Sequence, residues 1–396
     1  MANFERRTRK MSLEHWAWLG IAAQPGNRIV DDILRVFPDP EEFFLSGDLG
    51  IEKVGTINSK DALRIRATSL DVAKRAVETA ENYGAKVLTK ESEFYPQNLL
   101  SIESAPPVLY VLGDETCLNQ EPAVAVVGTR RISEYGNKMA KIIAGGLGSA
   151  GALVVSGMAL GIDSAAHKAC LSAGGKTVAV QGCGICKTFP PENVELKELI
   201  AANGAVISEF VPDEEARSSF FPIRNRIVSG MSLGVCVVEA AARSGTSITA
   251  NLAFDQGRKV FAVPADVNRS TSQGTFRLLR SGAIPVADAK DILMEFGEEY
   301  TSHLSFEKIQ KRKIEKNPEA KNERPEKASK PVKKAPPSGL SKNAAAIYSV
   351  LDRTPKSADE ISELTNLASS AVAVGLTELE LLGLIIPASG RRFVIA

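Results

Sequence analysis

The middle of the chain, from Ala123 to Val286, alternates short apolar runs with longer amphipathic stretches. The runs are mostly apolar and contain many β-branched residues, as expected for strands that are buried on both faces. Strands of this kind, separated by helices, predict an α/β fold with a doubly wound parallel sheet. The predicted strands are AVAVV (123–127), LVV (153–155), TVAV (177–180), AVISEF (205–210), LGVCVV (233–238), KVFAV (259–263) and AIPVA (283–287).

The chain before the sheet is predicted to be helical. From Met11 to about Leu88, apolar residues recur at the spacing of amphipathic helices, most clearly over 28–37 and 69–85. Beyond the sheet, the segment 305–337 is rich in Lys, Glu and Pro, so it lacks the apolar surface that a packed core needs. We therefore expect a helical domain at 1–95, an α/β domain at 96–300, a flexible charged linker at 301–340 and a further domain at 341–396.

The C-terminal segment has the pattern of a winged helix. Three stretches with helical spacing, 341–353, 357–366 and 369–385, each begin with a serine that can serve as an N-cap. A short apolar stretch at 393–396 predicts a strand. Three helices followed by a β-wing are typical of the winged-helix-turn-helix motif.

Composition restricts the class of protein. Hydrophobic residues make up 44% and charged residues 24% of the 396 positions, which is ordinary for a soluble globular chain. The sequence contains no apolar run of about 18 residues and no signal-peptide core, and its five cysteines are scattered. We therefore expect a cytoplasmic protein without a membrane span or a disulfide framework.

The net charge of +1 conceals an uneven distribution. Between Lys308 and Lys334 there are 11 Lys or Arg residues and 4 Asp or Glu residues, so the predicted linker is basic and the rest of the chain is acidic. The total charge is therefore uninformative about polyanion binding. Any anion site must arise from the placement of individual residues.

Three loops that follow predicted strands carry residues suited to an anion. Ligands of doubly wound sheets bind beyond the carboxyl ends of the strands. Glycines there allow close approach to the backbone, and small hydroxyls and helix-start amides favour phosphate. The sequence has neither a GxGxxG fingerprint nor a Walker loop, so a nucleotide site of those kinds is not predicted. The candidates are Gly128, Thr129 and Arg130 after the first strand, Ser156, Gly157 and Gly161 after the second, and Ser244, Gly245 and Thr246 after the fifth.

A further candidate is a stretch in which two arginines flank an amide, Arg224, Asn225 and Arg226, behind Phe220 and Phe221. The guanidinium fork suits phosphate oxygens, and an aromatic ring can stack on an unpaired base. Together these residues predict contacts with single-stranded nucleic acid. The alternative is that Arg226 pairs with a carboxylate and both phenylalanines belong to the core.

Other features point less clearly to chemistry. Cys183 and Cys186 have the spacing of a redox or zinc pair, but no second cysteine pair accompanies them, so we predict no metal site. His167 follows Asp163 by four residues, and without a nucleophile beside it we favour a structural hydrogen bond over acid-base catalysis. Glu239 ends a strand at the ligand-binding edge and is either a base or an anchor for a helix and loop. We therefore predict no catalytic residue and no cofactor.

Five stretches, in this order, resemble the DNA-processing protein A family, also called DprA or Smf. They are VAVVGTRRISEYG (124–136), VVSGMALGIDSAAHKACL (154–171), FPIRNRIVSGMS (221–232), VVEAAARSGTSITANLAFDQGRKVFAVP (237–264) and SQGTFRLLRSGA (272–283). The N-terminal helical part resembles the SAM-like domain of that family, and the last segment resembles its winged-helix tail. Ala265, Phe189 and the pair Cys183 and Cys186 depart from the family pattern.

The resemblance implies a Rossmann-like DNA-binding domain and a role without catalysis. Proteins of the family bind incoming single-stranded DNA during natural transformation, protect it and help to load the RecA recombinase. A homodimer through the α/β domain is also implied. On this basis we expect phosphate contacts from Arg130, Arg224 and Arg226, amide contacts from Gly157 and Gly245, and stacking by Phe220 or Phe221.

Two alternatives come from other classes of protein. A nucleotide-processing enzyme of the phosphoribohydrolase-like Rossmann superfamily would carry a PGGxGTxxE motif, but this chain has only Arg243-Ser-Gly-Thr and no matching glutamate. A transcription regulator would read duplex DNA through the winged helix. The predicted recognition helix, SSAVAVGLTELELLG, contains no Lys or Arg, so duplex binding there is not expected.

Overall fold

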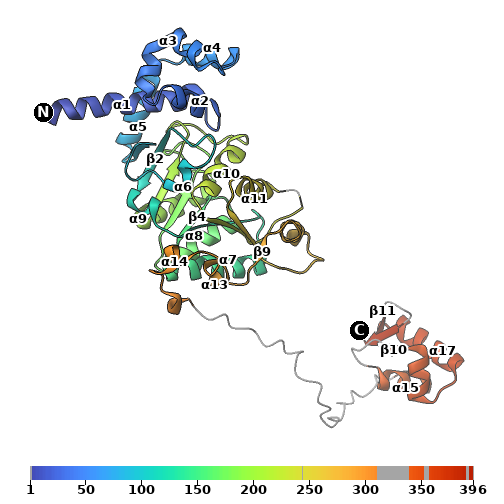
Figure 1. Cartoon of the computed structure of the whole chain (residues 1–396). Helices are drawn as coiled ribbons and strands as arrows, with labels where there is room; N and C mark the ends of the chain where they lie inside the picture. Colours follow the sequence, from blue (N-terminus) through green and yellow to red (C-terminus); the bar gives the residue numbers. More distant parts are fainter. Residues whose placement is uncertain (1, 243, 310–338, 352–355, 389–391, 396) are drawn as a thin grey trace. The chain divides into compact units, whose positions relative to one another are not determined.

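The chain folds into two compact units, Met1–Lys313 and Ile314–Ala396. Figure 1 shows the computed structural model. The structure describes residues 2–242, 244–309, 339–351, 356–388 and 392–395.

The N-terminal region is helical, as predicted, and lies at one end of the first unit (Figure 1). Buried Trp16, Trp18 and Phe43 are part of its core. Asp39 begins one helix by accepting a hydrogen bond from the backbone amide of Glu41 at 2.9 Å, and Pro40 follows in the first helical position. The helices are α1 (Ala2–Ala23), α2 (Ile29–Val36), α3 (Pro40–Val54), α4 (Ser59–Ala67) and α5 (Leu70–Asn82).

A sheet of nine strands forms the centre of this unit, in the order β1-β2-β6-β5-β4-β3-β7-β8-β9. The seven predicted strands are all present and pair in parallel. Their bounds are β3 (Ala123–Val127), β4 (Leu153–Ser156), β5 (Thr177–Val180), β6 (Ala205–Ser208), β7 (Gly234–Val237), β8 (Lys259–Ala262) and β9 (Ile284–Pro285).

Two strands were not predicted. β1 (Lys86–Thr89) and β2 (Val108–Gly113) extend the sheet beyond β6, and both of their pairings are antiparallel. The sheet is therefore parallel over the seven predicted strands and antiparallel only at this additional edge. These strands were missed because β2 follows Pro106 and Pro107, which suggest a turn, and because its partner β6 lies about ninety residues further along the chain.

Helices cover both faces of the sheet, as expected for a doubly wound fold. Alternate residues of one strand contact opposite layers: Val154 belongs to the core with α7 and α8, and Val155 to the core with α10 and α11. The helices of the first layer are α7 (Glu134–Ala150), α8 (Ile162–Ser172), α9 (Val194–Asn203) and α13 (Ala289–Leu293). Those of the second are α6 (Gln97–Leu100), α10 (Phe220–Gly230), α11 (Gly245–Asp255) and α12 (Gln273–Arg280).

The end of the first unit includes the start of the predicted linker. After α14 (Glu298–Thr301), the backbone amide of Ser305 donates to the carbonyl of Ala150 at 2.9 Å. Phe306 and Ile309 pack on the core that contains α7. Residues 310–338 of the predicted linker lie outside the described residues.

The second unit is a winged helix, as predicted. Ser341 and Ser357 serve as N-caps, and Ser357 forms a capping box with Glu360. The third helix differs from the prediction, because its N-cap is Ala368, and Ser369 and Ser370 lie inside its first turn. The elements are α15 (Lys342–Val350), α16 (Ala358–Thr365), α17 (Ser369–Leu381), β10 (Lys356–Ser357), β11 (Ile385–Ala388) and β12 (Arg392–Ile395), with sheet order β10-β12-β11.

Candidate nucleic-acid interface

The candidate loops lie at the point where the strand order reverses. Strands β3 to β6 extend the sheet in one direction and β7 to β9 in the other, so β3 pairs with both β4 and β7. The loop after β3 begins at Gly128, and the start of α11 follows β7. Ligands of doubly wound sheets bind at such switch points.

The loops after β3 and β4 pack directly on each other. The backbone amide of Thr129 donates to the carbonyl of Glu239 at 2.8 Å, and the carbonyl of Thr129 accepts from the amide of Ile162 at 3.1 Å. Gly161 has a φ of +85°, and a Cβ atom there would lie 2.3 Å from the Thr129 carbonyl oxygen. Glycine is therefore required at position 161 for the two loops to meet.

Arg130, Phe221 and Arg224 come together beside these loops. The exposed Arg130 guanidinium lies 5.1 Å from the centre of the Phe221 ring, and Arg224 lies 6.0 Å from it. The half-buried Phe221 also contacts Phe189, with 5.3 Å between the ring centres. Among the residues predicted from the sequence, Arg130 is therefore an arginine that is exposed to solvent and also lies beside an aromatic ring.

Arg224 is buried and faces the protein interior. It donates hydrogen bonds to the carbonyl oxygens of Gly157 and Val180 and, at 3.2 Å, to the side chain of Asn225. Burial lowers the pKa of Arg224 to about 10, while Asp163 acts in the opposite direction. A Cβ atom at Gly157 would lie 2.6 Å from the guanidinium, so glycine permits this approach. Arg224 therefore holds the loops together rather than facing solvent.

Asp163 is the counter-charge of Arg224. Burial raises the pKa of Asp163, and Arg224 opposes that shift. The amide of Ala159 donates to the Asp163 carboxylate at 3.4 Å, and the amides of Gly157 and Gly128 also stabilise its charged form. The Gly157 amide that was expected to contact phosphate thus interacts with the protein's own carboxylate, which occupies the concave backbone between the loops.

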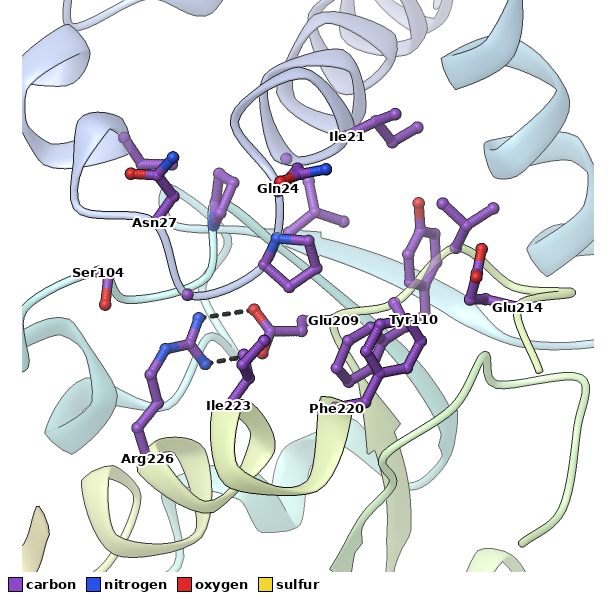
Figure 2. A pocket seen from close by; sticks show the side chains of 18 of the residues that line it. Ile21, Gln24, Asn27, Ser104, Tyr110, Glu209, Glu214, Phe220, Ile223 and Arg226 are labelled. Atoms are coloured by element: carbon purple, nitrogen blue, oxygen red, sulfur yellow. Dashed lines mark hydrogen bonds and ion pairs between the residues drawn. The ribbon is translucent and has the colours of Figure 1, made fainter. Parts of the chain in front are cut away.

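Arg226 does not join this group. Its guanidinium forms two hydrogen bonds to the Glu209 carboxylate, at 2.7 and 2.6 Å, and both side chains are buried (Figure 2). Burial raises the pKa of Glu209, and the Arg226 charge opposes the shift. Because residues two apart on a helix point to nearly opposite sides, Arg224 and Arg226 cannot share one groove. The expected convergence of three arginines is therefore limited to Arg130 and Arg224.

Phe220 and Phe221, like Arg226 and Arg224, lie on different sides of α10. Phe220 stacks on Phe210, with ring centres 4.3 Å apart and planes at 20°, while Phe221 faces Arg130. Glu209 and Phe210, which complete these contacts, were not identified from the sequence. The signal that could have found them is their position directly after β6, at the same strand edge as the predicted loops.

The remaining predicted loop residues differ in exposure. Ser156 is buried, and its hydroxyl donates to the carbonyl of Val126 at 2.7 Å, so its side chain is not available to a ligand. Ser244 is half-buried and precedes α11 without a side-chain cap, and Gly245 is exposed with open space around it. Thr246 is 8% exposed. The start of α11 therefore presents backbone to solvent.

The acid-base candidates are held by structural hydrogen bonds. The Glu239 carboxylate accepts from the amide and hydroxyl of Ser133, at 3.1 and 2.5 Å, and from the hydroxyl of Thr271, at 3.2 Å. Because the Thr177 hydroxyl donates to Val154, His167 Nδ1 donates to Thr177, at 2.7 Å. Burial lowers the pKa of His167 to about 3, so the ring is neutral at pH 7.

Two further observations concern metal binding and membrane-spanning helices. Within the described residues, no three His, Cys, Asp or Glu side chains are placed to share a metal ion. None of the helices found in those same residues is long and apolar enough to cross a membrane.

Two family models match the chain. The model for DNA recombination-mediator protein A matches residues 86–297, and the model for the DprA winged helix domain matches residues 331–391. DNA processing protein DprA of Streptococcus pneumoniae is 42% identical over 202 residues, which is 51% of this chain and 71% of the relative. Protein Smf of Synechocystis is 32% identical over 330 residues, or 80% of this chain and 82% of the relative.

Solved structures of DNA processing protein A also resemble this chain. The X-ray structure of DprA from Streptococcus pneumoniae superposes with a TM-score of 0.63 at 33% identity, covering 71% of this chain and 96% of that one. A second structure, which concerns the single-stranded DNA binding mode of DNA processing protein A from Helicobacter pylori, has a TM-score of 0.50 at 30% identity. It covers 54% of this chain and 97% of its own.

Proposed function

Because the chain belongs to the DNA recombination-mediator protein A family, known as DprA or Smf, we propose that it binds single-stranded DNA and helps to load RecA during transformation and recombination. The observation that carries this proposal is the exposed Arg130 guanidinium beside Phe221 at the switch point of the sheet. The Helicobacter pylori relative supports it, since that protein binds single-stranded DNA.

In the proposed complex, Arg130 contacts a phosphate and Phe221 offers its ring to a base. The exposed start of α11 at Gly245 adds backbone amides and the positive end of a helix dipole. Arg224 and Asp163 act indirectly, because they hold the loop after β4 in place. DNA that is bound along the loops at the ends of the β-strands is covered by the protein on that side, and this contact accounts for its protection.

Replacing Arg130 with alanine is expected to weaken single-stranded DNA binding about fivefold and to lower the salt slope by about one unit or less. One phosphate contact is lost, and the fold is unaffected because the side chain is exposed. Fluorescence anisotropy over a range of salt concentrations measures both quantities. Arg131→Ala, an exposed neighbour with the same charge, is the matched control and should change affinity less. Equal effects of both substitutions would contradict the assignment of Arg130.

The winged helix is expected to contribute little to this binding. The described residues on the exposed side of α17, Ser370, Ala373, Val374, Thr377 and Leu381, include no basic side chain. A chain that ends at Ile309 keeps the residues packed on α7 and should retain affinity within about threefold, with any loss sensitive to salt. If a fragment beginning at Gly339 bound DNA as tightly as the truncated chain, the main site would have been assigned to the wrong unit.

We also propose that the protein is not an enzyme. Glu239 is buried and accepts three hydrogen bonds from the protein, and His167 is fully buried, so neither side chain is accessible to a substrate. Incubation with nucleoside monophosphates, NAD and labelled DNA is expected to give no product, as judged by chromatography. Release of base or nucleotide in excess of the protein, lost in Glu239→Gln, would instead support the phosphoribohydrolase-like alternative.

Three further proposals rest on the family or, for the location, on the scattered cysteines and the lack of an apolar signal core in the sequence. These are a homodimer through the α/β domain, contact with RecA and a cytoplasmic location. Light scattering measures the mass of the protein in solution, and a mass of one chain would contradict the dimer. RecA nucleation on single-stranded DNA, with and without the protein, tests the loading role.

A further inference from the structure

A cavity of about 450 Å³ lies beside α10 and is lined by Phe220, Ile223 and Arg226 of that helix (Figure 2). Its walls come from the end of α1, the loop between α1 and α2, the segment before β2, the loop after β6 and the first turns of α10. Cavities that bind small molecules have volumes of about 300–1,000 Å³. We call this cavity the α10 pocket.

One helix connects the α10 pocket with the candidate DNA site. Phe220, Ile223 and Arg226 line the pocket, whereas Phe221 and Arg224 lie on the side of Arg130. The pocket also begins directly after β6, at the strand edge where the predicted loops lie. A strand held beside Arg130 therefore has to cross only the start of α10 to reach the pocket.

One buried donor in the wall of the pocket has no hydrogen-bond partner within the described residues. The Nε atom of Arg226 is buried and has no hydrogen-bond partner within the described part of the chain. The Glu209 carboxylate lies beside it and accepts from the other two guanidinium nitrogens. The hydroxyl of buried Tyr110 points toward the Ile21 end (Figure 2). An unpaired N–H donor in the wall favours a ligand that carries a carbonyl oxygen or a ring nitrogen as acceptor.

The charges of the pocket are balanced. Glu209 pairs with Arg226 in its depth, and Glu214 pairs with Arg217 nearer solvent at 2.7 Å. The walls between them are apolar and partly aromatic, with the stacked rings of Phe210 and Phe220. An ion without a counter-charge would be costly to bury here. A planar, uncharged heterocycle with hydrogen-bonding edges fits this lining.

The mouth of the pocket has a different character. Arg217 is 66% exposed there, and the first turn of α10 follows Ser219 without a side-chain cap. The ion pair with Glu214 uses one terminal nitrogen of Arg217, and its other N–H groups, together with helix-start amides, favour an anionic group that stays in solvent. A ligand with an uncharged planar ring inside and a phosphate outside satisfies both regions.

We propose that the α10 pocket binds one unpaired nucleobase. If the base belongs to the bound strand, the inference rests on the proposed function, and the phosphates cross the start of α10 between Arg130 and Arg217. Arg226 and Phe220, which are turned away from Arg130, then hold a base. A free nucleotide presents the same chemistry and is the other source.

Photo-cross-linking of the full chain tests this inference. A single-stranded oligonucleotide carrying 5-iododeoxyuridine is expected to cross-link within 17–30, 104–110 or 209–220, as located by mass spectrometry, whereas a cross-link at Phe221 reports on the Arg130 site. Free 5-iododeoxyuridine monophosphate is the second probe. Cross-links from the oligonucleotide assign the pocket to a base of the strand, and cross-links from the monophosphate alone assign it to a free nucleotide.

A variant in which a larger side chain fills the pocket tests the inference independently, through its affinity for DNA. Ile223→Trp places a large ring at the wall, and Leu199→Trp, at an exposed position of α9 outside the pocket, is the matched control. Wild-type protein is expected to bind an oligonucleotide with abasic sites about fivefold more weakly than the intact strand. Ile223→Trp should reduce this discrimination to the part that stacking on Phe221 provides, and Leu199→Trp should keep it in full. Circular dichroism verifies the fold of both variants.

The failures of the two proposals are distinguishable. If neither probe cross-links to these segments while the wild type binds the strand and Arg130→Ala weakens it, the pocket inference is overturned and the proposed function stands. If the wild type binds no single-stranded DNA, the proposed function fails, and the monophosphate alone decides whether the pocket binds a base.

Discussion

Replacement of Arg224 by methionine is expected to lower the free energy of unfolding of the first unit by about 3–5 kcal/mol, because Asp163 loses its buried counter-charge. Two carbonyl groups, those of Gly157 and Val180, lose their donor at the same time. Methionine keeps much of the side-chain volume, so the change is mainly electrostatic. Denaturant unfolding followed by circular dichroism measures the effect.

Two further variants separate this explanation from a general loss of packing. Adding Asp163→Asn to Arg224→Met removes the unpaired carboxylate and should restore at least about half of the lost stability. Arg217→Ala, at an exposed arginine of the preceding loop, should change stability by less than about 1 kcal/mol. If the double variant were no more stable than Arg224→Met, the charge pairing would not be the cause.

Breaking the ion pair of Arg226 and Glu209 is the second large effect. Arg226→Met leaves the Glu209 carboxylate 3% exposed without its partner, and we expect a loss of about 3–5 kcal/mol in the free energy of unfolding. Glu209→Leu should cost a similar amount, because it leaves the guanidinium unpaired. Replacing both residues together should cost less than either single change, since no uncompensated charge remains.

An exposed ion pair is the control for this cycle. Arg28 and Glu103 are 77% and 70% exposed, and Arg28→Ala should change stability by less than about 1 kcal/mol. Additive losses for Arg226→Met and Glu209→Leu in the double variant would show that the two charges are not coupled. The same three variants are also expected to change ligand binding in the α10 pocket, because Arg226 and Glu209 both line it.

The sequence was sufficient to predict the elements that depend on local pattern. Each of the seven parallel strands lies in a mostly apolar run, and each helix of the winged-helix unit follows from periodicity and turn signals. The position of the candidate loops followed as well, because parallel strands bring their carboxyl ends to one edge. Strands β1 and β2 could not be predicted in this way, since their antiparallel pairing depends on contact with distant β6.

The sequence by itself therefore determined the order of strands, loops and helices and the chemical types gathered at the sheet edge, because these depend on neighbours along the chain. Only the tertiary structure decided which of those residues face solvent. Arg224 and Arg226 are equivalent in the motif, yet the fold brings Asp163 to one and Glu209 to the other and leaves Arg130 exposed. A buried charge is stable only beside its opposite, and that partner comes from another segment of the chain.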